Sequence, residues 1–215
     1  MNAIASTLAT NRRQRAHQAV RELMAEQGFR ISMEAVAARV GCSKQTLYAQ
    51  FGSKQALLRS VIDSHLDVAT APLRLEGRSV RESLLGFALE HLQRRGDPAA
   101  MAACQLLEAS AHEFPREART LYEDGHAALQ RHLAEWLAAA MRRGQLRHDH
   151  PHCAAELLLG MLAGLDAERQ RFAVPHRAAA DERRRWAEYV VDAFLRAFTP
   201  ADPAAAEPAP DPAGR

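Results

Sequence analysis

Residues 43–54, SKQTLYAQFGSK, place many short hydrogen-bonding side chains on one short stretch. Lysine, glutamine and hydroxyl side chains can bind the edges of DNA bases in the major groove, and hydroxyl groups can also donate to phosphates. A helix that begins after Ser43 would turn these polar groups outward while Leu47 and Phe51 face its neighbours. The stretch therefore has the chemistry of a DNA-reading helix, although an ordinary solvated helix face can have the same composition.

A second group of residues could ligate a metal. His148, His150 and His152 alternate beside Cys153, and imidazole and thiolate are ligands of zinc and copper. The segment lies in a turn at Pro151, where alternate histidines need not converge. We interpret it as a solvated loop at the start of a helix, with a metal site as the alternative, and we expect no cofactor.

The charge of the chain is distributed unevenly. The net charge is +2, but residues 1–60 hold nine basic and three acidic residues, which leaves −4 for the remainder. This asymmetry favours an N-terminal part that binds a polyanion, with chance clustering on the surface as the alternative. The chain has no leader-like N-terminus and no run of about 20 apolar residues. Three cysteines, far apart and without C-x-x-C spacing, favour a reducing compartment, so we expect a soluble cytoplasmic protein.

Helical periodicity along nearly the whole chain predicts an all-α fold of about nine helices. Helices over about 11–27, 33–40, 43–51 and 53–69 would form a helix-turn-helix unit around Gly41 and lead into a longer fourth helix. Further helices should start at Ser79, Pro98, Pro115, Pro151 and about Ala178. We therefore expect a disordered N-terminus (1–10), a helix-turn-helix DNA-binding domain (11–58), a second helical domain (59–198) and a disordered Ala/Pro-rich tail (199–215).

Residues 28–62 closely resemble the N-terminal domain of the TetR family of transcriptional regulators. The matching features are A-A-R-x-G at the turn, S-K-x-T-L-Y in the reading helix and F-x-S-K-x-x-L before the fourth helix. The resemblance implies a homodimer that binds a palindromic operator in double-stranded DNA. Gln45 and Gln50 depart from the commonest family pattern, which bears on the operator sequence and not on DNA binding itself. The expected DNA-contacting residues are Ser32, Ser43, Lys44, Gln45, Thr46, Tyr48, Ala49, Gln50 and Lys54.

The run from Leu107 to Gly164 looks like one recurrent type of TetR-family C-terminal domain, with Glu113-Phe114-Pro115 and AAELLLGMLAG as its markers. That resemblance implies that residues 59–198 form a ligand-binding and dimerisation domain, with a dimer interface and a pocket for a small, apolar effector. The candidate pocket residues, each of which could instead be plain core, are Phe87, His91, Met101, Cys104, Tyr122, His126 and Met161. The candidate interface residues are Leu157, Gly160, Gly164, Trp186, Tyr189, Val190, Ala193, Phe194 and Ala197.

The sequence contains no motif for a convergent acid–base or nucleophilic site, so we expect that the protein is not an enzyme. Our prediction is a homodimeric, ligand-responsive regulator of the TetR type that acts as a repressor.

Overall fold

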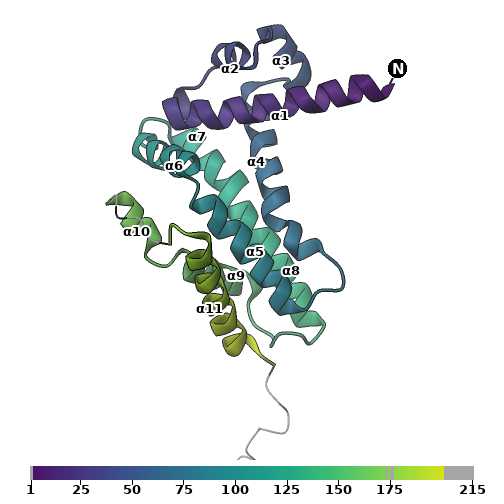
Figure 1. The fold of residues 1–215 in the computed structure, drawn as a ribbon, viewed down its shortest axis with the longest axis vertical. Helices are drawn as coiled ribbons and strands as arrows, with labels where there is room; N and C mark the ends of the chain where they lie inside the picture. Colours follow the sequence, from purple (N-terminus) through teal and green to yellow (C-terminus); the bar gives the residue numbers. More distant parts are fainter. Residues whose placement is uncertain (1, 173, 175–176, 201–215) are drawn as a thin grey trace, which may run out of the picture.

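The computed structural model describes residues 2–172, 174 and 177–200, and Figure 1 shows a helical N-terminal domain above a larger helical part. The N-terminal domain consists of α1 (Asn2–Gln27), the short 3-10 turn η1 (Gly28–Arg30), α2 (Met33–Val40), α3 (Lys44–Phe51) and the start of α4 (Lys54–Thr70). The described residues contain no strand. The all-α prediction is confirmed.

Serine caps fix where the helices of the N-terminal domain begin. The hydroxyls of Ser32, Ser43 and Ser53 accept hydrogen bonds from backbone N–H groups in the first turns of α2, α3 and α4. Gly41 ends α2 with φ of 75°, a conformation that glycine adopts without steric cost and that turns the chain sharply into α3. The buried residues of this domain form one apolar core from all four helices.

The larger part continues after the 3-10 turn η2 (Ala71–Arg74) with α5 (Val80–Arg95), α6 (Pro98–Ser110) and α7 (Pro115–Leu121). A π-helical segment, Tyr122–Ala127, leads into α8 (Ala128–Arg142), which is followed by α9 (Pro151–Ala163), α10 (Asp166–Arg171) and α11 (Ala180–Phe198). The expected capping box is present, since Ser79 and Glu82 bond each other's backbone N–H groups. Helices α5, α8, α9 and α11 pack together around the second core.

Three features differ from the sequence-based expectations. First, α1 begins at Asn2, whereas we expected disorder up to residue 10; residues 2–10 contain neither glycine nor proline, so nothing in them stops a helix. Second, the long helix expected from Pro115 is interrupted by the π-helical segment around Gly125, and third, α10 was not expected. The tail predicted to be disordered lies, from residue 201 onward, outside the described residues.

Helix α4 belongs to both cores. Leu57 and Val61 are buried in the N-terminal core, while Leu66 and Ala69 are buried in the C-terminal core. The boundary that we expected at residue 58 therefore falls inside a continuous helix. A displacement of α4 in the C-terminal core also displaces its part in the N-terminal core, because close-packed cores transmit displacement. Among the described residues, no helix is both long enough and apolar enough to cross a membrane.

Candidate nucleic-acid interface

Helix α3 presents a polar face to solvent while one leucine anchors it. Leu47 is 0% exposed and packs in the N-terminal core, whereas the next residue, Tyr48, is turned away from that core and is 42% exposed. Lys44, Gln45 and Ala49 are also exposed. A helix held by its inner face with amide, ammonium and phenol groups outside can enter a major groove without disturbing its own packing.

The start of α3 is held by a small hydrogen-bond network. The Ser43 hydroxyl accepts from the Thr46 backbone N–H at 3.1 Å and lies 2.9 Å from the Thr46 hydroxyl. Lys44 forms an ion pair with Glu34 of α2, and its ammonium lies 5.8 Å from the centre of the Tyr48 ring. The hydrogen bond from Lys44 lowers the pKa of Glu34, and the same bond raises the pKa of Lys44. A predicted base-reading residue is thus paired within the protein.

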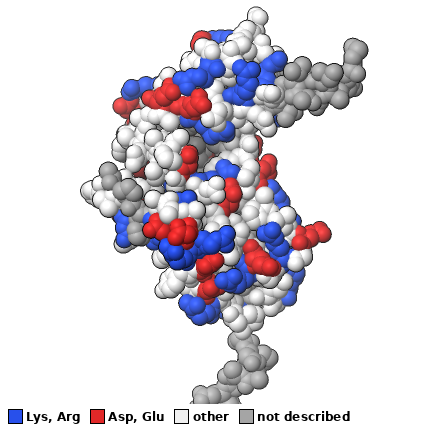
Figure 2. All heavy atoms as spheres, in the orientation of Figure 1, with Lys and Arg blue, Asp and Glu red and all other residues white. Residues whose placement is uncertain are grey.

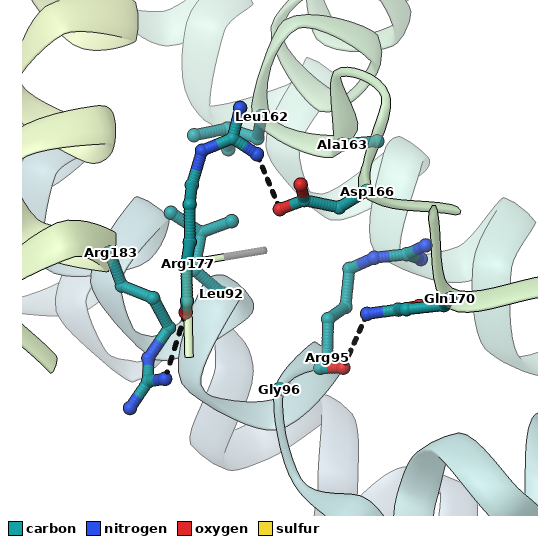
Figure 3. Close-up of a pocket in the computed structure, with 9 residues that line it drawn as sticks. All are labelled: Leu92, Arg95, Gly96, Leu162, Ala163, Asp166, Gln170, Arg177 and Arg183. Atoms are coloured by element: carbon teal, nitrogen blue, oxygen red, sulfur yellow. Dashed lines mark hydrogen bonds and ion pairs between the residues drawn. The ribbon is translucent and has the colours of Figure 1, made fainter. Parts of the chain in front are cut away.

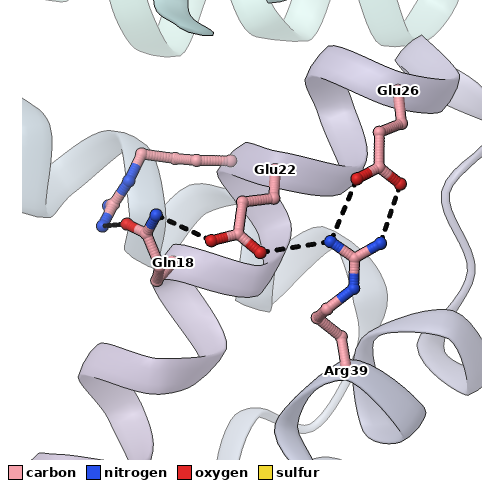
Figure 4. A network of polar contacts seen from close by, with 5 residues as sticks. Gln18, Glu22, Glu26 and Arg39 are labelled. Atoms are coloured by element: carbon pink, nitrogen blue, oxygen red, sulfur yellow. Dashed lines mark hydrogen bonds and ion pairs between the residues drawn. The ribbon is translucent and has the colours of Figure 1, made fainter.

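A second network fixes α2 against α1 (Figure 4). Both terminal nitrogens of Arg39 donate hydrogen bonds to the Glu26 carboxylate, at 3.0 and 2.8 Å. One of these nitrogens also donates to the Glu22 carboxylate, at 3.1 Å. The hydrogen bonds to Glu26 and Glu22 raise the pKa of Arg39. Arg15 on α1 donates to the Val40 carbonyl at the end of α2. Planar, two-pronged contacts of this kind restrict orientation, so they support the orientation in which the shared apolar core holds α2 against α1.

Four of the predicted DNA-contacting residues are only half exposed. Ser32 and Thr46 take part in the caps of α2 and α3, and Lys54 donates to the Phe29 carbonyl at 3.2 Å. The Oε1 atom of Gln50 is buried without a hydrogen-bond partner. Sequence reasoning missed the residues that position the helix, notably Glu34 and Arg39, because their pairing partners lie on other helices.

Figure 2 shows Lys and Arg side chains spread over the N-terminal domain, together with a group of acidic side chains. The acidic residues Glu22, Glu26 and Glu34 of this domain are all engaged by Arg39 or Lys44. The excess of basic residues in 1–60 is therefore only partly compensated, which leaves the domain suited to a polyanion.

Comparison with known families agrees with this geometry. Residues 18–61 match the family described as bacterial regulatory proteins, tetR family, and residues 82–200 match the AefR-like transcriptional repressor C-terminal domain. The two matches together span both domains. The chain belongs to the TetR family of transcriptional regulators.

Individual relatives share about a quarter of their aligned residues with this chain. The repressor BdcR of Escherichia coli is 26% identical over 70% of this chain and 75% of its own length. The regulator YezE of Bacillus subtilis is 28% identical over 47% of this chain, a match that spans only about half of YezE, 54%. A solved TetR-family structure from Mesorhizobium loti has a TM-score of 0.72, with 25% identity over 89% of this chain and 98% of that one. The flavonoid-responsive regulator FrrA has a TM-score of 0.66, with 28% identity over 90% of this chain and all of that one.

The structure separates the candidate pocket residues into two groups. Phe87 is 0% exposed inside the C-terminal core, and Met161 lies on α9 in a surface groove with Leu157 and Gly160. A pocket role for these two residues stays a prediction, because helical spacing alone does not tell which neighbour a side chain meets. The remaining candidates lie on α5, α6 and the π-helical segment, where His91 and Met101 are half-buried and Cys104, Tyr122 and His126 are exposed.

The candidate interface residues also divide. Val190 and Phe194 were wrong, since they are 1% and 0% exposed within the subunit's own core. Gly164 ends α9 and lies against Trp186, where an added Cβ would be 3.2 Å from the indole ring. The close approach that we expected there is therefore made within the subunit. The residues left on the outer side of α9 and α11 are Leu157, Gly160, Tyr189 and Ala197, with Ala193 and Trp186 half-buried.

The small pocket in Figure 3 lies between the end of α5 and the segment that joins α9 to α11. The Arg177 guanidinium pairs with Asp166 and stacks 3.8 Å from the centre of the Trp186 ring, and the Trp186 N–H donates to the Leu162 carbonyl. The cavity has a volume of about 20 Å³, which admits little more than a water molecule. This cavity is too small for an effector.

The histidine-rich turn has a structural task. His150 caps α9, because its Nδ1 accepts from the backbone N–H of Cys153 at 3.3 Å. The His150 and His152 rings lie 6.0 Å apart and tilted. Nowhere in the described part of the chain do three or more His, Cys, Asp or Glu side chains gather closely enough to hold a metal.

Proposed function

We propose that this TetR-family protein is a repressor that binds a palindromic operator as a homodimer and releases it when a small molecule binds. The observation that carries the DNA-binding role is α3, whose Leu47 is fully buried while Lys44, Gln45 and Tyr48 face solvent. The repressor role is supported by the likeness to BdcR and to the AefR-like repressor domain.

The outer face of α9 and α11 supports the dimer. Tyr189 is 64% exposed and Leu157 is 49% exposed, which is unusual for large apolar side chains that lie on neighbouring helices. An added Cβ at Gly160 would meet nothing within 4 Å, so a second copy could approach this helix closely. A two-fold dimer would place two α3 helices on half-sites about 34 Å apart.

The role of an effector is supported by α4. This helix shares both cores, so a ligand that binds beside it in the C-terminal domain would favour one orientation of the reading head over another. A ligand changes the population only to the extent that it binds the two forms differently. FrrA is described as flavonoid-responsive, and that likeness supports a small-molecule effector here.

The experiment that tests this function is selection of bound sequences from a random duplex pool, followed by titration of the best sequence at several salt concentrations. We expect a palindrome, one dimer per site, and an affinity that falls steeply with salt because Lys and Arg displace counterions. No enriched sequence, or enrichment of an asymmetric single site bound by a monomer, would contradict the proposal.

A further inference from the structure

The N-terminal end of α1 continues beyond the core of the N-terminal domain. Ala16 is the first residue of α1 that belongs to this core, and the side chains of residues 11–15 are all exposed. The helix begins at Asn2, so it runs about 20 Å along its axis before it reaches the core. Figure 1 shows this end of α1 projecting past α3 and α4. We call residues 2–15 the α1 arm.

The charge of the α1 arm is entirely positive. The arm contains three arginines and no acidic residue. The two acidic residues of α1, Glu22 and Glu26, lie on later turns and are both paired with Arg39 of α2. Within the described residues, no ion pair joins Arg12 or Arg13 to a carboxylate. Figure 2 shows Lys and Arg side chains gathered on the side of the N-terminal domain toward which α1 projects. The arm therefore presents uncompensated positive charge.

The base of the α1 arm is fixed beside the reading helix. The Arg15 guanidinium donates a 2.6 Å hydrogen bond to the carbonyl of Val40, at the end of α2, and lies 3.9 Å from the place that a Cβ would take on Gly41. Two residues further along α1, the His17 ring lies 6.2 Å from the ring of Phe51, the last residue of α3. The arm thus leaves the domain next to the segments that flank α3, in a position that these contacts hold.

We propose that the α1 arm binds the DNA backbone beside the base pairs that α3 reads, and that Arg12 and Arg13 contact its phosphates. The inference rests on the proposed function, because it enlarges the DNA surface of the same reading head. Duplex DNA carries one negative charge for about every 1.7 Å of its axis, so phosphates are available along the whole length of such an arm. Contacts to phosphates position a protein without reading sequence, so the arm should add affinity and not specificity.

An anionic membrane is the other polyanion that could attract the α1 arm. A helix that lies on a membrane buries an apolar face among the lipids. Residues 11–15, NRRQR, are all polar and therefore provide no such face next to the charges. The attachment of Arg15 at the turn before α3 also places the arm beside the polar side chains of the reading helix. Both observations favour DNA.

The test compares Arg12→Ala/Arg13→Ala with the wild type in titrations of the selected operator at several salt concentrations. We expect operator binding to weaken about tenfold or more, because two phosphate contacts are lost in each subunit. The slope of log affinity against log salt should become shallower by about 3 to 4. The affinity for an unrelated duplex of the same length should fall by a similar factor, since phosphate contacts carry no sequence information.

Matched variants separate contact with DNA from net charge. Arg142→Ala/Arg143→Ala removes the same charge from two adjacent exposed arginines at the end of α8, distant from α1 in Figure 1, and should leave operator affinity nearly unchanged. Arg12→Lys/Arg13→Lys should retain most of the binding, because lysine also binds phosphate, as a point charge. Circular dichroism should show that every variant is folded, since all of these side chains are exposed.

Hydroxyl-radical footprinting locates the α1 arm on the operator. The alanine variant should lose protection at backbone positions beside those covered by α3 and keep the remaining protection. Unchanged operator affinity in Arg12→Ala/Arg13→Ala, or an equal loss in Arg142→Ala/Arg143→Ala, would overturn the inference and leave the DNA-binding role intact. Unchanged DNA affinity together with loss of binding to phosphatidylglycerol vesicles would also overturn it, and would assign the arm to a membrane surface.

Binding to random duplex distinguishes this inference from the proposed function. If the wild type selects no sequence and Arg12→Ala/Arg13→Ala still binds random duplex more weakly than the wild type, the arm is supported and the proposed function is contradicted. A wild type that binds no duplex would overturn both.

Discussion

The Arg59 guanidinium of α4 donates a 3.0 Å hydrogen bond to the Asp124 carboxylate in the π-helical segment. A second connection joins η1 to the corner between α6 and α7, where Arg30 pairs with Glu113 at 2.6 Å and the rings of Phe29 and Phe114 lie 5.9 Å apart. These two connections add to the packing of α6 against α1, which also holds the reading head on the C-terminal domain.

We expect Arg59→Ala to weaken operator binding several-fold, because α4 loses one of its attachments and the two reading heads become less well oriented before binding. The free energy of unfolding should fall by less than about 1 kcal/mol, since the pair is largely exposed. Gel shift with the selected operator and urea denaturation measure the two effects. The control is Arg81→Ala, which removes a similar exposed pair with Asp192 between α5 and α11. Equal losses of operator affinity in both variants would contradict this account.

Lys44 and Glu34 should have opposite effects on DNA binding. Lys44→Ala removes a predicted base contact and should weaken operator binding about tenfold or more. Glu34→Gln releases Lys44 from its ion pair and removes a negative charge beside α3, so operator binding should become tighter. Titrations of each variant at matched salt concentration measure both. Weaker binding by Glu34→Gln would show that the ion pair is needed to hold Lys44 in its reading position.

The reading helix could be predicted from the sequence because its determinants are local. Ser43 caps α3 within three residues, and Leu47 follows one turn later as the buried anchor. Two ion pairs could not be predicted: that of Lys44 with Glu34 and that of Arg39 with Glu26 of α1. Each joins two helices whose crossing angle is set by the whole domain. The family resemblance supplied the functional roles that spacing alone leaves open.

The C-terminal domain was less predictable for a related reason. The apolar stripe of α11 contains Val190 and Phe194. The helical spacing of these residues shows that one face of α11 is buried, but it does not show whether the same subunit or a second subunit covers that face. The contact of His65 with Arg94 could not be predicted, because the two residues are far apart in the sequence and meet only where α4 packs against α5. The π-helical segment itself has only Gly125 as a local signal, which is weak.

The buried histidines should make stability depend on pH. Burial lowers the pKa of His91 from its ordinary value of 6.5 to about 3, with Arg95, His65 and His126 adding to the shift. Between these values the unfolded chain binds more protons than the folded chain, so stability is complete above about pH 6.5 and falls as the pH is lowered. We expect a slope of about 1 kcal/mol per pH unit from this residue.

Urea denaturation of wild type and His91→Leu across the range from neutral to acidic pH measures this slope. The variant should show a smaller loss of stability on acidification, whereas His132→Leu, at an exposed position on α8, should follow the wild type. His17 contributes in the same direction, because burial and then Arg13 and Arg21 lower its pKa, so part of the acid sensitivity will persist. Identical slopes for wild type and His91→Leu would show that this imidazole is not enclosed in solution.

Leu157→Asp should separate dimerisation from folding. Leu157 is 49% exposed on α9, so a carboxylate at this position costs little in the isolated subunit but would be desolvated at a two-fold interface. We expect a folded monomer in light-scattering measurements. We also expect loss of binding to the full operator, because a single reading head contacts only one half-site. The control is Leu75→Asp, which changes a leucine of the same 49% exposure in the connection before α5 and should leave a dimer. A dimer with wild-type operator affinity in Leu157→Asp would place the interface elsewhere on the C-terminal domain.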